Sequence, residues 1–160
     1  MNYDLSPKEK IKVCALLVNS KLDKYIELHD LILNKSGTFR SFIKNLVGIS
    51  VPFDQFVQRA EELEKELKTT TDGLYSTRNS IKTSMTPEEG KYMNCLITYA
   101  EKVHQTITAL RDCQEAYYKK SKGDKLDWST ASELEDLYKR SIDDYKEVGL
   151  QLNDLSNIIF

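Results

Sequence analysis

Apolar residues recur every seven positions along four long stretches of this sequence. In the second stretch the repeat is carried by Phe53, Ala60, Leu67, Leu74 and Ile81. A seven-residue apolar repeat keeps one face of an α-helix apolar over its whole length, as in a coiled coil. The chain has only three prolines and six glycines, so little interrupts such helices. The pattern therefore predicts an all-α protein of long helices.

Start signals mark where three of these helices begin. Ser6-Pro7-Lys8-Glu9 and Thr86-Pro87-Glu88-Glu89 each combine a capping hydroxyl, a proline at the first helical position and a glutamate that completes a capping box. Thr130-Ala131-Ser132-Glu133 repeats the hydroxyl and the glutamate. We therefore expect four helices, at residues 7–34, 53–84, 87–120 and 130–159.

The weakest part of the predicted second helix is the run from Thr69 to Gly73. Threonine, aspartate and glycine are poor helix formers. The heptad phase nevertheless continues across this run. We therefore expect a continuous helix rather than a break.

Similar helix lengths and short second and third connections predict a single-domain, up-down-up-down four-helix bundle. The first connection is longer, a crossover segment at residues 36–52. Residues 38–47 within it have the pattern of a short helix, with Phe39 and Phe42 among its apolar residues. Counting along the bundle places this crossover at the same end as the loop that carries Trp128.

Composition narrows the classes of function. The net charge of −2 and the pI of about 5.8 give no general attraction to nucleic acid. The first ten residues lack the basic and apolar segments of a secretory signal, and the apolar run from Cys14 to Val18 is too short to span a bilayer. The three cysteines have no metal-ligand spacing. We therefore expect reduced thiols in a cytoplasmic protein.

One candidate site is a buried polar cluster of His29, Cys113 and Tyr138. Antiparallel counting brings these residues to one level of the core, and the Tyr138 hydroxyl is the expected hydrogen-bond partner of His29. A histidine–cysteine pair could also form a nucleophile. Such a pair needs an orienting residue and an oxyanion hole, and the sequence indicates neither. We therefore predict no catalytic residues.

Glu101 and His104 match the Glu-x-x-His spacing of di-iron helix bundles. Those sites need a second such motif and two further glutamates, all directed inward. In this chain, Ile26 stands where a motif ending at His29 would need its glutamate. The heptad count also places Glu101 and His104 on the outer face. The sequence therefore predicts no metal site and no cofactor.

The crossover end of the bundle is the second candidate site, because basic and aromatic residues collect there. Its structural role would be to cover the surplus apolar side of the first helix. Alternatively, part of it stays exposed and docks a partner, since aromatic residues and arginine anchor many such contacts. The candidate partner-binding residues are Phe39, Arg40, Phe42, Lys44, Lys120, Lys122 and Trp128.

The tyrosines support a different class of function. Six of the nine fall on or beside the helix seams, where threonines also occur, so the middle of the core is rather polar. A bundle with such a core can hold a small amphipathic ligand between its helices. The six are Tyr25, Tyr92, Tyr99, Tyr117, Tyr138 and Tyr145.

Together these patterns predict a non-enzymatic bundle that acts by protein–protein interaction, as an adaptor, inhibitor or regulatory module. The alternatives are binding of a small amphipathic ligand and peripheral contact with an anionic membrane through the basic, aromatic end. Homodimer formation through the first helix competes with all of these. The apolar residues that would support it are Val13, Leu16, Leu17 and Leu31.

Overall fold

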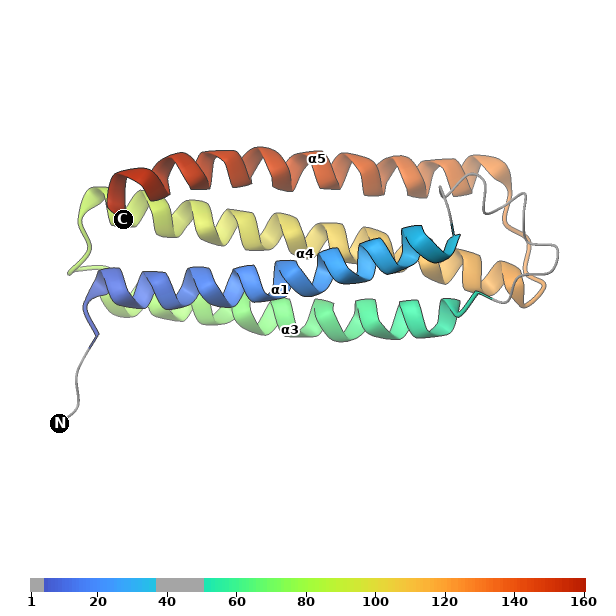
Figure 1. Cartoon of the computed structure of the whole chain (residues 1–160), viewed down its shortest axis with the longest axis horizontal. Helices are drawn as coiled ribbons and strands as arrows, with labels where there is room; N and C mark the ends of the chain where they lie inside the picture. Colours follow the sequence, from blue (N-terminus) through green and yellow to red (C-terminus); the bar gives the residue numbers. More distant parts are fainter. Residues whose placement is uncertain (1–4, 37–50) are drawn as a thin grey trace.

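The computed structural model describes residues 5–36 and 51–160, with only the backbone described for residues 34–36. These residues form four α-helices and contain no strand, so the all-α prediction is confirmed for this part of the chain. The predicted short helix in the crossover lies outside the described residues. The helices are α1 (Pro7–Ser36), α3 (Phe53–Ile81), α4 (Pro87–Ser121) and α5 (Trp128–Ile159) (Figure 1).

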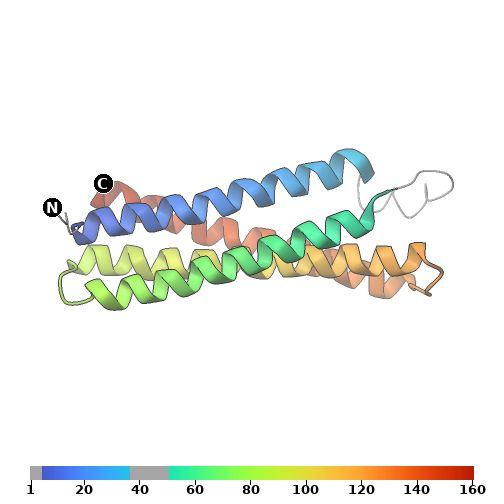
Figure 2. The ribbon, with the colours of Figure 1, turned by 90° about the horizontal axis from the view of Figure 1, so that it is seen from below.

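The four helices lie side by side along one long axis (Figures 1 and 2). α4 packs against α3, α5 and α1, and α1 also packs against α3. The start of α1 and the end of α5 lie at the end of the molecule where α3 turns into α4 (Figure 1). The α4–α5 turn lies at the opposite end, where α1 ends and α3 begins. This packing is that of a helix bundle.

The central helix is α4. It contributes fourteen buried residues, against five from α5. Met93 and Ile107 are among the fully buried residues, because α4 is covered on more than one side. The repeat from Phe53 to Ile81 in α3 is also buried, as its spacing predicted. The core is thus built around α4.

Two of the three predicted capping boxes are present. The Glu9 amide donates to Ser6 Oγ at 3.3 Å, and the Ser6 amide donates to Glu9 Oε2 at 2.8 Å. Thr86 and Glu89 make the same reciprocal pair at 3.2 and 2.8 Å. Both caps satisfy amides that would otherwise lack a partner at the helix start.

The predicted start of the last helix was wrong. Asp127, not Thr130, caps α5: its Oδ1 accepts from the Thr130 amide at 2.9 Å and its Oδ2 accepts from the Thr130 hydroxyl at 2.8 Å. Aspartate is as good an N-cap as serine and better than threonine. The helix therefore begins at Trp128, which lies in its first turn and not in the preceding loop.

α3 continues through the weak run, as expected, but ends at Ile81 rather than at residue 84. The hydroxyls of Thr69, Thr70 and Thr71 donate to the carbonyls four residues earlier, at 2.9–3.0 Å. These bonds occupy polar groups that would otherwise compete with the helical backbone for partners. α1 ends at Ser36 and α4 at Ser121, two residues and one residue beyond the prediction, and, apart from the start of α5, the remaining bounds agree with it.

Gly149 allows α5 to approach a tyrosine of α4. A Cβ added at this position would lie 3.1 Å from Cε2 of Tyr99. The Tyr99 ring is buried and packs edge-on against Tyr145, so it has little room to move. Gly73 in α3 is different, because a Cβ there would meet nothing within 4 Å.

The two glycines therefore predict opposite responses to the same change. Gly73→Ala should raise the free energy of unfolding by about 0.5–1 kcal/mol, since alanine is the better helix former. Gly149→Ala gains the same propensity but crowds Tyr99, and overpacking costs about 1–3 kcal/mol. Urea denaturation of the two variants measures the difference. Equal stabilisation by both substitutions would contradict the close packing of Gly149 on Tyr99.

Candidate functional site

A chain of hydrogen bonds links α1 to α5 within the bundle. The Tyr138 hydroxyl lies 2.6 Å from Nδ1 of His29 and 2.7 Å from the Tyr25 hydroxyl. Tyr25 and Tyr138 are buried, and His29 is half-buried. The hydrogen bond between His29 and Tyr138 expected from the heptad count is therefore present, and Tyr25 extends it. Tyr25 also packs edge-on against Tyr145 of α5.

The surroundings of His29 favour its neutral form. Burial lowers its pKa below the ordinary value of 6.5, the carboxylate of Asp30 opposes this, and the charge of Lys146 adds to it. A neutral imidazole has one donor and one acceptor nitrogen. Which role Nδ1 takes toward Tyr138 depends on the tautomer. The arrangement is that of a structural polar contact within the core.

Cys113, the third residue of the predicted cluster, is buried as expected, but its thiol is not a reactive nucleophile. Its side chain is buried in α4. Burial, with smaller contributions from the charges of Glu135 and Asp112, raises its pKa from 9.0 to about 12. The thiolate is the nucleophilic form of cysteine, so this thiol is inert near neutral pH.

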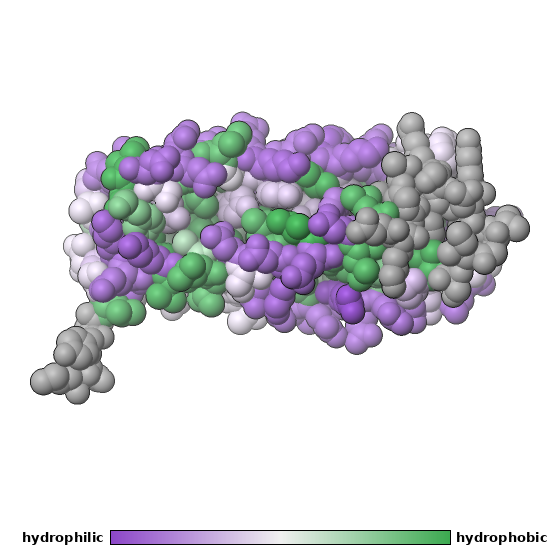
Figure 3. All heavy atoms as spheres, viewed as in Figure 1, coloured by the Kyte–Doolittle hydropathy of each residue, from purple (hydrophilic) through white to green (hydrophobic). Residues whose placement is uncertain are grey.

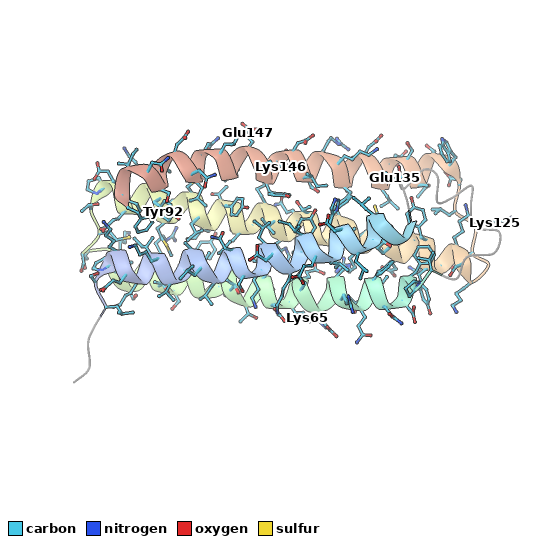
Figure 4. All side chains as sticks on the ribbon, viewed as in Figure 1. Lys65, Tyr92, Lys125, Glu135, Lys146 and Glu147 are labelled. Carbon is cyan, nitrogen blue, oxygen red and sulfur yellow. The ribbon has the colours of Figure 1, made fainter. Side chains whose placement is uncertain are left out.

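A second buried polar contact was missed at the sequence level. Glu135 of α5 is 4% exposed, and its Oε1 accepts from the Tyr117 hydroxyl at 2.7 Å. Figure 4 shows Glu135 toward the same end of the bundle as Lys125. The sequence does indicate that Glu135 is buried, because Ala131, Glu135 and Tyr138 follow the four-then-three spacing of residues on the core face of a helix. Gln114, which is 1% exposed, was missed in the same way.

Glu101 and His104 are not on the outer face, which corrects the prediction. Both are half-buried on the side of α4 that meets α3. Glu101 accepts from the Tyr75 hydroxyl at 2.5 Å, and His104 Nε2 lies 4.0 Å from Glu64 Oε1. Each therefore contacts a residue of α3. Among residues 5–36 and 51–160, no group of three or more potential metal ligands comes together.

The other candidate site is defined here by Lys122, Lys125 and Trp128 and is called the Trp128 end. Trp128 is 54% exposed, although it is the largest apolar side chain of the protein. Lys122 is exposed, with Nζ 5.4 Å from the ring centroid of Tyr118, and Lys120 is half-buried. Four predicted partner-binding residues lie outside the described part of the chain: Phe39, Arg40, Phe42 and Lys44.

The six seam tyrosines are buried and pack into the core. In the described part of the chain, four of the surface grooves lie along helix boundaries or at helix ends, and these four are lined by residues other than the six tyrosines. The largest of the four runs between α4 and α5, past Thr108, Leu137 and Arg140. Binding of an amphipathic ligand in the tyrosine-lined core stays a prediction.

Comparison with protein-family models, with curated proteins and with solved structures found no match to this chain. Within the described residues, none of the helices combines the length and the apolar character needed to cross a bilayer.

The low pKa of His29 predicts how stability depends on pH. As the pH falls through about 6.5, the unfolded chain takes up a proton at this histidine before the folded protein does, so the free energy of unfolding decreases. His29→Gln should remove this decrease between about pH 7.5 and pH 5.5. Urea denaturation across this range measures it.

His104→Gln is the matched control, since His104 is the only other histidine. Glu66 also has a lowered pKa, because it bonds Lys21 and Lys24, but its ordinary value of 4.5 lies below the tested range. An unchanged pH dependence in His29→Gln would contradict the assignment to His29.

Proposed function

We propose that this protein acts by binding another protein through the Trp128 end. The observation that carries the proposal is the exposure of Trp128, 54%, in the first turn of α5. Tryptophan offers a large rigid apolar surface, and it is among the residues that most often dominate the affinity of protein interfaces. A half-exposed tryptophan at the start of a well-packed helix is a suitable anchor.

The charges beside Trp128 support an acidic partner surface. Lys122 and Lys125 are both exposed on the turn that leads into α5. Asp124 and Asp127 lie there too, but the carboxylate of Asp127 is engaged in capping the helix. Lys120 adds a positive charge just before the turn, at the end of α4. Positive charge at the rim of an apolar contact steers association with an acidic surface. The role we propose is that of an adaptor, inhibitor or regulatory module.

We also propose that the protein is not an enzyme, and the high pKa of the buried Cys113 thiol supports this. The proposed architecture is an up-down-up-down bundle with a crossover at residues 36–52. We also propose a cytoplasmic location. It is supported by the three cysteines, Cys14, Cys95 and Cys113, which are all free thiols.

Trp128→Ala tests the proposal directly. Loss of an anchor residue typically costs about 2 kcal/mol of binding free energy, roughly thirty-fold in affinity. Tagged wild-type protein should retain a specific protein from an extract of its source cell, and Trp128→Ala should lose it. The affinities of wild type and variant for the retained protein are then compared by isothermal titration calorimetry, because Trp128→Ala removes the single tryptophan that fluorescence would follow.

Leu150→Ala is the matched control. Leu150 is an exposed apolar residue of the same helix, 68% exposed, and lies about 33 Å from Trp128 at 1.5 Å per residue. It should retain the partner as wild type does. Retention of the same protein by Trp128→Ala and wild type alike would overturn the proposal.

A further inference from the structure

The outer face of α1 carries an apolar surface in its N-terminal half, called here the α1 patch: Val13, Leu16 and Leu17. Their exposed fractions are 47%, 68% and 50%. Val18 of the same stretch is buried, and at about 100° per residue Leu16 lies on nearly the opposite side of the helix. Figure 3 shows hydrophobic side chains at the surface over this half of α1. Leu31, also predicted to be available, is instead partly buried against the core.

The neighbouring helix α3 leaves Leu17 uncovered for a local reason. Lys24 of α1 donates to Glu66 of α3 at 2.8 Å, which marks the boundary between these antiparallel helices. Leu17 lies seven residues before Lys24, and Gly73 lies seven residues after Glu66. Seven residues are close to two helical turns, so Leu17 and Gly73 also face the boundary between α1 and α3. Gly73 has no side chain, and a Cβ there would meet nothing within 4 Å. No side chain at position 73 can therefore cover Leu17.

Charge is segregated along α1 on either side of the patch. Residues 8–12 contain three lysines and one glutamate, which gives 3 − 1 = +2. Residues 13–20, VCALLVNS, contain no charged residue. Residues 21–30 contain three acidic residues and two lysines, which gives 2 − 3 = −1. Both lysines, Lys21 and Lys24, bond Glu66 of α3, so the remaining exposed charges of this segment are those of Asp23, Glu27 and Asp30. The helix thus reads basic, apolar and acidic in order.

We propose that the α1 patch binds a second copy of this chain, with the two α1 helices antiparallel. A two-fold axis near Leu17 buries the three patch residues of each copy against those of the other. The same axis places the basic segment of each copy beside the acidic segment of the other, so the favourable contact occurs twice. A parallel pair would bring like charges together, which disfavours it.

The geometry names one ion pair. Lys12 lies on the flank of α1 that faces α5, with Nζ 5.1 Å from the ring centroid of Phe160. Asp23 follows eleven residues later, close to three helical turns, and so lies on the same flank. The proposed two-fold axis is perpendicular to the helices, so it places the flank with Lys12 and Asp23 in one copy beside the same flank of the other copy. Lys12 of one copy therefore faces Asp23 of the other, and the midpoint between them falls next to Leu17.

Sedimentation equilibrium of the full chain over a range of concentrations tests the proposal. Wild type should form a dimer, and Leu16→Glu should weaken it at least about tenfold, because a buried unpaired carboxylate is strongly disfavoured. Leu16 is 68% exposed in the single chain, so the variant should fold normally by circular dichroism. Leu150→Glu, at an equally exposed leucine of α5, is the control and should dimerise as wild type does.

A charge exchange tests the antiparallel geometry. Lys12→Glu and Asp23→Lys should each weaken the dimer, and the double variant should restore it, because the pair is re-formed with its signs reversed. Trp128→Ala should leave the dimer intact, which separates this surface from the Trp128 end. A wild type that stays monomeric, a dimer unaffected by Leu16→Glu, or a double variant no tighter than the singles would each overturn the proposal.

Discussion

The burial of α4 against three other helices is the constraint on which the rest of the structure depends. A helix covered on most sides needs apolar residues beyond a single stripe, and α4 supplies them with Met93 and Ile107. Its polar residues must then find partners within the protein. Thr106 donates to the carbonyls of Lys102 and Ser141, at 3.0 and 2.9 Å, and so ties α4 to α5.

α1 is attached to the bundle in a different way. It packs on α3 and on α4, whereas long side chains make its contacts with α5. The phenol of Tyr138 reaches both Tyr25 and His29, so one hydroxyl joins two turns of α1 to α5. Because α1 covers the bundle from one side only, its outer face remains in contact with solvent. The apolar residues of that face are then available to a partner.

Much of this arrangement could be predicted from the sequence, because heptads and capping boxes act locally. The register that pairs His29 with Tyr138 also follows from counting. The start of α5 was missed although aspartate is the stronger cap, because Thr130 and Glu133 also have the spacing of a capping box. Glu135 was missed because a carboxylate is rarely buried, although its spacing placed it in the core. Half-buried positions such as Glu101 depend on the neighbouring helix, which periodicity alone does not identify.

The α1 patch and the Trp128 end together determine how a dimer would present its two partner-binding surfaces. Leu17 lies nineteen residues before the end of α1 at Ser36, which is the end of the bundle where the α4–α5 turn leads to Trp128. An antiparallel pair centred near Leu17 would leave both Trp128 ends free and direct them away from each other, about 60 Å apart at 1.5 Å per residue. Such a dimer could hold two partner molecules at once. It would gain avidity only toward partners whose own sites span that distance.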